Sequence, residues 1–138
     1  MKYTDKLSKI DGCPPKALTP RSGAAFRFVF ADTGHPNNFL PPAVIKPGRF
    51  AAASARVCCS GYALSMYETK AQILRSAKEA QKSNPLFLKR IGDHVAELHL
   101  EDNDGMCGEP SLTGHFDFFE AVAFIGEQRV VAIEKVEL

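Results

Sequence analysis

The sequence predicts an α+β fold, in which a mainly antiparallel sheet is covered by one main helix. From Gly92 onward, three segments rich in β-branched and aromatic residues are separated by Asp, Asn, Gly, Pro and Ser, as strands are separated by turns. Two earlier segments, near 26–31 and 62–67, also have the composition of strands. Residues 69–82 carry the clearest helix signal in the chain.

Length and composition indicate one domain. A chain of 138 residues can bury roughly two thirds of its unfolded surface in a single core. Its 45% hydrophobic and 24% charged residues are near the globular average, which argues against wholesale disorder. Residues 1–24 contain Pro14, Pro15 and Pro20 without a sustained period. We therefore expect an irregular N-terminal arm over 1–24 and a single domain over 25–138.

The sequence contains no sign of export, membrane insertion or metal binding. No apolar run approaches the roughly 18 residues of a bilayer span, and the first residues alternate charged with apolar side chains, unlike a signal peptide. We therefore expect a soluble cytoplasmic protein. Disulfides are rare in that compartment, so free thiols are predicted at Cys13, Cys58, Cys59 and Cys107. No Cys or His spacing fits a metal site, and no motif indicates a cofactor.

Charge is divided unevenly along the chain. Residues 1–90 hold 15 Lys and Arg and 5 Asp and Glu, a net of +10, whereas residues 91–138 hold 2 and 11, a net of −9. Such a division either attracts an anionic partner to the first part or is satisfied when the two parts, or two subunits, pack together. Self-complementarity within one fold is the simpler interpretation.

The first strand and the loop after it are predicted from aromatic and proline residues. Phe26, Phe28 and Phe30 alternate on one face of a strand. Between 32 and 48 four prolines and several turn-forming residues predict a long loop. Loops of this length often cover a site or bind a partner, although this one can equally close the edge of the core.

The helix over 69–82 begins with a capping signal. Thr69-Lys70-Ala71-Gln72 fits the capping box, and apolar residues follow at helical spacing. Ser83-Asn84-Pro85 ends the helix. We expect it to lie across the sheet with its basic residues outward. These residues make nucleic acid a possible partner, but neither interleaved aromatic residues nor a recognisable motif supports that assignment.

The final third predicts a three-stranded meander over 94–100, 115–124 and about 129–138, with the last strand pairing through a turn at Gly126-Glu127. Strict alternation places the Glu120 carboxylate on the apolar face between Phe118 and Val122. A buried carboxylate must be paired, hydrogen-bonded or shifted in pKa, and each of these marks a candidate site. A β-bulge would turn it to solvent instead.

Glu120, His115 and Ser65 are the candidate catalytic residues. His115 follows a glycine at the start of a predicted strand, where an imidazole acts as acid, base or ligand, or simply caps the turn. Ser65 lies on the strand before the main helix but lacks the glycines of a nucleophile elbow. The candidate ligand-binding residues are Arg27, Tyr62 and Arg49.

Three of these residues carry a resemblance to a known family. Arg27 on an early strand, Ser65 on a strand running into a helix and Glu120 on a late strand resemble the Arg-Ser-Glu arrangement of ADP-ribosyltransferases. The resemblance implies that the arginine holds the phosphates of NAD, the serine supports the nicotinamide-binding strand and the glutamate stabilises an oxocarbenium ion. The family's usual Glu or Gln two places before the catalytic glutamate is Phe118 here, a departure from arginine-directed transfer.

Three functions follow as hypotheses. The first is a small binding or accessory module that engages a protein, a second copy of itself or a small anionic ligand. The second is an enzyme, with NAD as the cofactor that the resemblance implies. The third is nucleic-acid binding through residues 69–90. A membrane partner is not expected.

Overall fold

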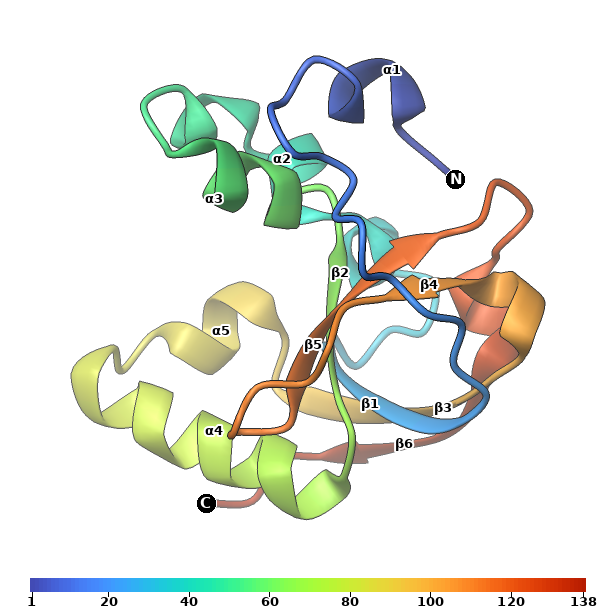
Figure 1. Cartoon of the computed structure of the whole chain (residues 1–138). Helices are drawn as coiled ribbons and strands as arrows, with labels where there is room; N and C mark the ends of the chain where they lie inside the picture. Colours follow the sequence, from blue (N-terminus) through green and yellow to red (C-terminus); the bar gives the residue numbers. More distant parts are fainter.

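The computed structural model describes all 138 residues and confirms the α+β class, with one antiparallel sheet and one main helix (Figure 1). The strand order is β4-β5-β2-β1-β3-β6. The strands are β1 (Gly23–Val29), β2 (Leu64–Tyr67), β3 (His94–Leu100), β4 (Gly105–Cys107), β5 (His115–Glu120) and β6 (Val130–Lys135). The helices are α1 (Thr4–Leu7), α2 (Pro42–Ile45), α3 (Ala55–Ser60), the main helix α4 (Lys70–Ser83) and α5 (Phe87–Ile91), with 3-10 turns η1 (Pro36–Phe39), η2 (Pro47–Phe50), η3 (Asp102–Asp104) and η4 (Gly126–Arg129).

The predicted C-terminal meander is wrong in its connections. Its three segments are strands, but β5 pairs with β4 and β2, whereas β6 pairs with β3. The chain crosses from β5 to the opposite side of the sheet between 121 and 129, and buries Phe124 in the core on the way. The two edges of the sheet nevertheless approach each other: Arg129, just before β6, forms an ion pair with Asp104, just before β4, with Nε and Oδ2 2.7 Å apart. The predicted hairpin between β5 and β6 is therefore absent, and the two strands lie in different parts of one curved sheet (Figure 1).

One face of the sheet, here called the core face, carries the largest apolar cluster. Alternate residues of a strand point to the same face, and β2, β3 and β5 contribute every second residue to it. Phe39 of η1 and Val130 and Ile133 of β6 are partly buried and pack against it. The buried members are Ala25, Val29, Leu64, Met66, Ala96, Leu98, Leu100, Cys107, Phe116, Phe118 and Phe124.

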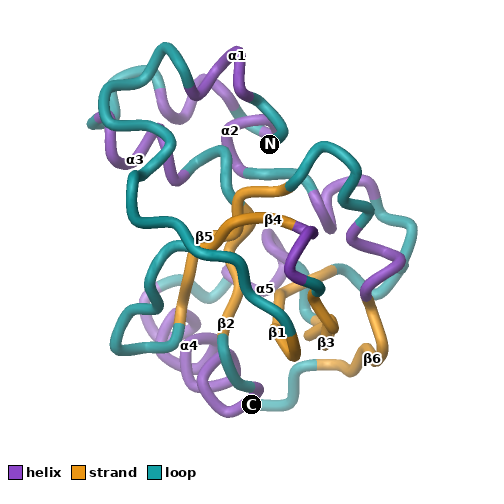
Figure 2. Tube along the Cα trace, turned by 45° about the vertical axis from the view of Figure 1, so that its right-hand side comes forward, coloured by secondary structure: helices purple, strands orange, loops and turns teal.

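The opposite face, here called the helix face, is covered at its two ends by different elements. At one end α4 packs Ile73 and Ala77 against Phe26 and Tyr67. At the other end Leu7 of α1, Cys59 of α3 and Ala63, just before β2, pack around Phe119. Figure 2 shows α1, α2 and α3 gathered above β2 and β5, with α4 below them. The middle of the helix face lies between these two apolar clusters.

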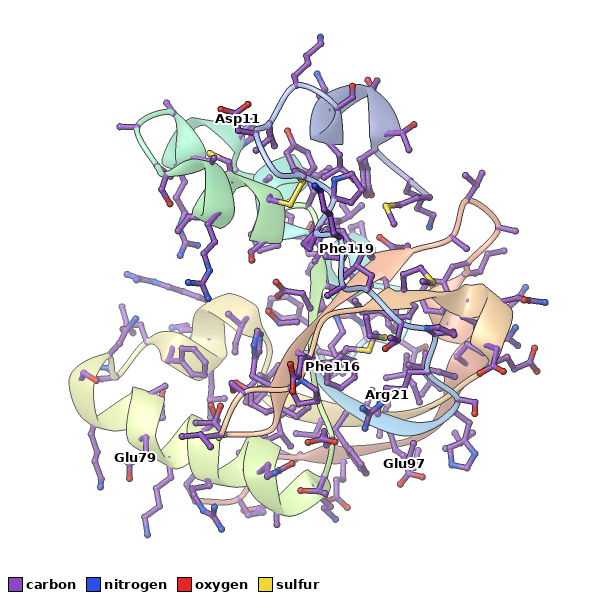
Figure 3. The ribbon with its side chains drawn as sticks, viewed as in Figure 1. Asp11, Arg21, Glu79, Glu97, Phe116 and Phe119 are labelled. Carbon is purple, nitrogen blue, oxygen red and sulfur yellow. A yellow bond between two sulfur atoms is a disulfide. The ribbon has the colours of Figure 1, made fainter.

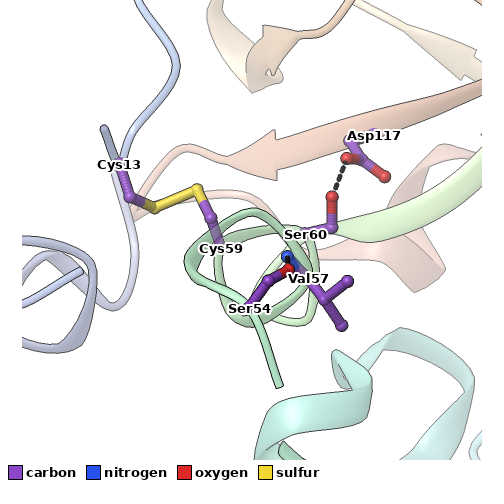
Figure 4. The surroundings of a disulfide bond; sticks show 6 residues. All are labelled: Cys13, Ser54, Val57, Cys59, Ser60 and Asp117. Atoms are coloured by element: carbon purple, nitrogen blue, oxygen red, sulfur yellow. Dashed lines mark hydrogen bonds between the residues drawn. A yellow bond between two sulfur atoms is a disulfide. The ribbon is translucent and has the colours of Figure 1, made fainter. Parts of the chain in front are cut away.

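The prediction of four free thiols is wrong for two of them. Cys13 and Cys59 form a disulfide, whereas Cys58 and Cys107 are free (Figure 4). The fold brings the N-terminal segment against α3, so that the two Cα atoms lie 5.8 Å apart, within the range that a disulfide requires. The two cysteines are separated by 46 positions, and no local pattern in the sequence indicated this pairing.

None of the helices has the length and apolar character that a bilayer crossing needs.

The start of α4 confirms half of the predicted capping box: Thr69 caps the helix, but the Gln72 side chain accepts from the Thr69 hydroxyl at 3.0 Å and not from the Thr69 amide. The Thr69 hydroxyl accepts a hydrogen bond from the Gln72 amide at 3.2 Å. We expect Thr69→Ala to lower the free energy of unfolding by about 1 kcal/mol, because the amide loses its acceptor. Urea denaturation measures this loss, with Thr69→Ser as the control that keeps the hydroxyl. Equal stability of the two variants would show that the cap contributes nothing.

Candidate functional site

The middle of the helix face carries polar side chains from β2 and β5. Ser65 is the pairing partner of Asp117, and Tyr67 is the pairing partner of His115. Paired residues of antiparallel strands share a face, as do residues two apart on one strand. These four side chains therefore project from the same face; Tyr67 belongs to the apolar cluster under α4, and Ser65, His115 and Asp117 lie between that cluster and the one around Phe119.

Two hydrogen bonds between side chains organise this region. Nε2 of His115 lies 3.0 Å from Oγ of Ser65. The Ser60 hydroxyl, at the end of α3, donates to Oδ2 of Asp117 at 2.7 Å (Figure 4). The imidazole and the Tyr67 ring also pack in a T-shaped arrangement, with centroids 5.4 Å apart. We call Ser60, Ser65, His115 and Asp117 the polar cluster; Ser65 is exposed and the other three are half-buried.

The helices beside the polar cluster are strongly basic. On α3, Arg56 precedes Ser60 by four residues, and both therefore lie on the same side of that helix. From 69 to 91 the only acidic residue is Glu79, on α4 (Figure 3). The exposed cations of this stretch are Lys70, Arg75, Lys78, Lys82, Lys89 and Arg90. Only Lys70 and Lys82 form ion pairs, so the surface retains a positive charge.

Arg27 lies on the core face and makes structural contacts. Strands β1 and β2 pair only at Phe26 and Tyr67. Beyond that point, Arg27 donates through Nη1 to the main-chain oxygen of Ser65 at 2.9 Å and through Nε to that of Asn38 at 2.7 Å. Burial lowers the pKa of the guanidinium to about 10, against the opposing effect of Glu120. Arg27 thus joins diverging strands, and two of its nitrogen atoms are already occupied.

Glu120 is buried on the core face, as the alternation indicated. Its side chain is 1% exposed, and Oε1 pairs with Nζ of Lys2 at 2.8 Å. Oε2 has no hydrogen-bond donor within the protein. Burial raises the pKa of this carboxyl, while Lys2 and then Arg27 oppose the rise. Val122, which strict alternation would place on the same apolar face, is exposed because β5 ends at Glu120.

The structure thus divides the predicted site residues between two faces of the sheet. Ser65 and His115 come together on the helix face, whereas Glu120 and Arg27 lie on the core face. The arrangement that resembles ADP-ribosyltransferases is therefore not assembled around one cleft. Tyr62 packs on Tyr3 of the N-terminal segment, with ring centroids 5.9 Å apart.

Arg49 is exposed on η2 and lies over the Phe50 ring at 5.8 Å. The sequence reasoning missed Ser60 and Asp117. Asp117 could have been found, because it lies two places after His115 on the same strand. Ser60 carried no signal, since α3 was not predicted from its small residues.

The polar cluster does not line either of the two hollows described below, and it does not form a metal site. Two hollows, of about 240 and 250 Å³, are lined by other residues: one lies beside Phe39 and Ile133, and the other beside Arg21 and Cys107. No group of three or more His, Cys, Asp or Glu side chains is placed to hold a metal ion.

None of the protein-family models, curated proteins or solved structures compared with this chain matches it.

Proposed function

We propose that this protein is a binding module that holds a small anionic ligand, such as a phosphate ester, at the polar cluster. The observation that carries the proposal is an exposed serine, hydrogen-bonded to a histidine, on the part of the sheet left between two apolar clusters. Hydroxyl and protonated imidazole groups both donate to phosphate oxygens.

The surrounding charges support an anion over a cation. The unpaired cations on α4 and α5 raise the local concentration of an anionic ligand, and Arg56 extends the positive charge along α3. Asp117 would repel a phosphate at close range. Its carboxylate, already bonded to Ser60, instead suits a hydroxyl or amino group elsewhere on the ligand. A ligand that carries both an anionic and a donor group therefore fits best.

NMR titration of the labelled protein tests this proposal. We expect inorganic phosphate and adenosine monophosphate, but not adenosine, to shift the amide signals of Ser60, Ser65 and His115. Ser65→Ala and His115→Gln should each weaken binding about tenfold, because each removes a hydrogen bond to a charged group. Lys16→Ala is the control, since Lys16 is an exposed cation of the N-terminal segment. Absence of shifts at millimolar concentration, or equal weakening by Lys16→Ala, would contradict the proposal.

A protein partner or a second copy of the chain is the further candidate. The ion pairs Lys2–Glu120 and Lys70–Glu134 join the basic and acidic parts of the sequence within one molecule. Most cations of α4 and α5 have no such partner. Light scattering at two salt concentrations tests charge-driven self-association, which should weaken as salt rises. A mass that stays monomeric at low salt excludes it.

The cytoplasmic location also remains a proposal. The Cys13–Cys59 disulfide counts against it, because disulfides persist mainly in oxidising compartments. Alkylation of thiols during lysis in denaturant, which also exposes the buried Cys107, followed by mass spectrometry, decides the question. Two alkylated cysteines indicate that the disulfide exists in the cell, and four indicate a reduced protein.

A further inference from the structure

Ser65 and His115 have the geometry of a nucleophile and its general base. Such a pair requires a separation of about 2.6–3.2 Å between the hydroxyl oxygen and a ring nitrogen, and here Oγ and Nε2 are 3.0 Å apart. Ser65 is exposed, so an electrophile can reach Oγ from solvent. Both residues lie on paired strands, and a sheet holds side chains more firmly than a loop.

The position of His115 is fixed from three directions. Its main-chain oxygen accepts from the Ser111 amide at 2.8 Å, its strand pairs with β2 at Tyr67, and the Tyr67 ring contacts the imidazole. Tyr67 is itself held by a hydrogen bond to Ser76 of α4 at 2.8 Å. These contacts hold the imidazole beside Ser65 even when no anionic ligand is bound at the polar cluster.

We propose that Ser65, with His115 as its base, accepts acyl and phosphonyl groups from activated donors. In the acyl transfer, Oγ of Ser65 forms a bond to the carbonyl carbon of an ester while its proton moves to Nε2 of His115. The bond from that carbon to the alcohol oxygen breaks, and the alcohol leaves with the proton returned by His115. Water then slowly hydrolyses the acyl-serine to the carboxylic acid and free Ser65. With a fluorophosphonate, Oγ of Ser65 forms a bond to phosphorus, the P–F bond breaks and fluoride leaves, while the hydroxyl proton passes to Nε2 of His115.

The rest of the site sets the expected speed. Nδ1 of His115 has no hydrogen-bond partner in the protein, so no carboxylate orients the imidazole as the third member of a triad does. Asp117, the nearest carboxylate on the same strand, is bonded to Ser60 instead. We therefore expect a slow reaction that labels the serine once, rather than rapid turnover.

Labelling with a fluorophosphonate and with p-nitrophenyl acetate, followed by peptide mass spectrometry, tests the inference. The expected adduct is on Ser65, absent in Ser65→Ala and unaffected in Ser22→Ala, whose serine is exposed. His115→Gln and His115→Asn should each slow labelling about 100-fold, the lower range of general-base catalysis. The labelling rates of the wild type and of the two His115 variants should differ in their dependence on pH, because only the wild type carries the base.

An adduct distributed over several serines, or a Ser65 rate unchanged in both folded His115 variants, would overturn the inference. Thermal unfolding of each variant shows whether it is folded. The inference uses the same cluster as the proposed function but does not depend on ligand binding. If the wild-type protein is labelled at Ser65 but does not bind phosphate, the binding proposal alone is contradicted. If it binds phosphate but Ser65 is not labelled, this inference alone is contradicted.

Discussion

Replacing both Cys13 and Cys59 by serine is expected to lower the free energy of unfolding by about 4 kcal/mol. The bond closes a loop between positions 46 apart, and a crosslink of that span restricts the unfolded chain by about this amount. The same bond holds the N-terminal segment over Phe119 and Ala63. Its loss should therefore also speed amide hydrogen exchange in residues 1–13 more than in β1 or β3.

Chemical denaturation with and without reductant measures the effect. The wild type should lose about the same stability in reductant as the double variant loses without it, and the double variant should not respond to reductant. Cys58→Ser is the matched control, because Cys58 is a neighbouring free thiol. If reductant leaves wild-type stability unchanged, the disulfide does not contribute as expected.

Replacing Lys2 by methionine is expected to cost about 3 kcal/mol at neutral pH. Removing one partner of a buried ion pair leaves the other charge uncompensated, which costs about 3–5 kcal/mol in a fully buried pair. The Lys2 side chain is 28% exposed and that of Glu120 1%, so solvent screening places the loss at the lower end. Lys2 also donates to the main-chain oxygen of Phe124 at 2.8 Å.

The pH dependence of this loss has a defined sign. The folded pKa of Glu120 is raised by burial, so protonation favours the folded state, and stability falls as pH rises from the unfolded pKa through the folded one. Without Lys2 the folded pKa should rise further. The loss caused by Lys2→Met should consequently be smaller at pH 5 than at pH 8.

Denaturation of three variants at these two pH values separates the charge effect from packing. Adding Glu120→Gln to Lys2→Met should restore most of the stability, because no buried charge remains. Lys6→Met is the control, since Lys6 is exposed on α1 and has no ion pair. A loss that is independent of pH and not reduced by Glu120→Gln would show that Lys2 acts through packing alone.

Several local features could be predicted from the sequence because neighbouring residues produce them. Thr69 caps α4 through an amide three positions away, and Glu120 is buried because alternation fixes the face to which each side chain of a strand points. The α+β class follows from these same local periods.

The tertiary structure alone decided which segments became neighbours. The pairing of β6 with β3, the Cys13–Cys59 bond and the meeting of Ser65 with His115 each join residues that are distant in the chain. Alternation within a strand shows which neighbours of Ser65, and which neighbours of Glu120, point to the same face as that residue. It does not give the order of strands in the sheet, which depends on the packing of the whole core. For this reason the candidate residues were found individually, but their division between two faces was not predicted.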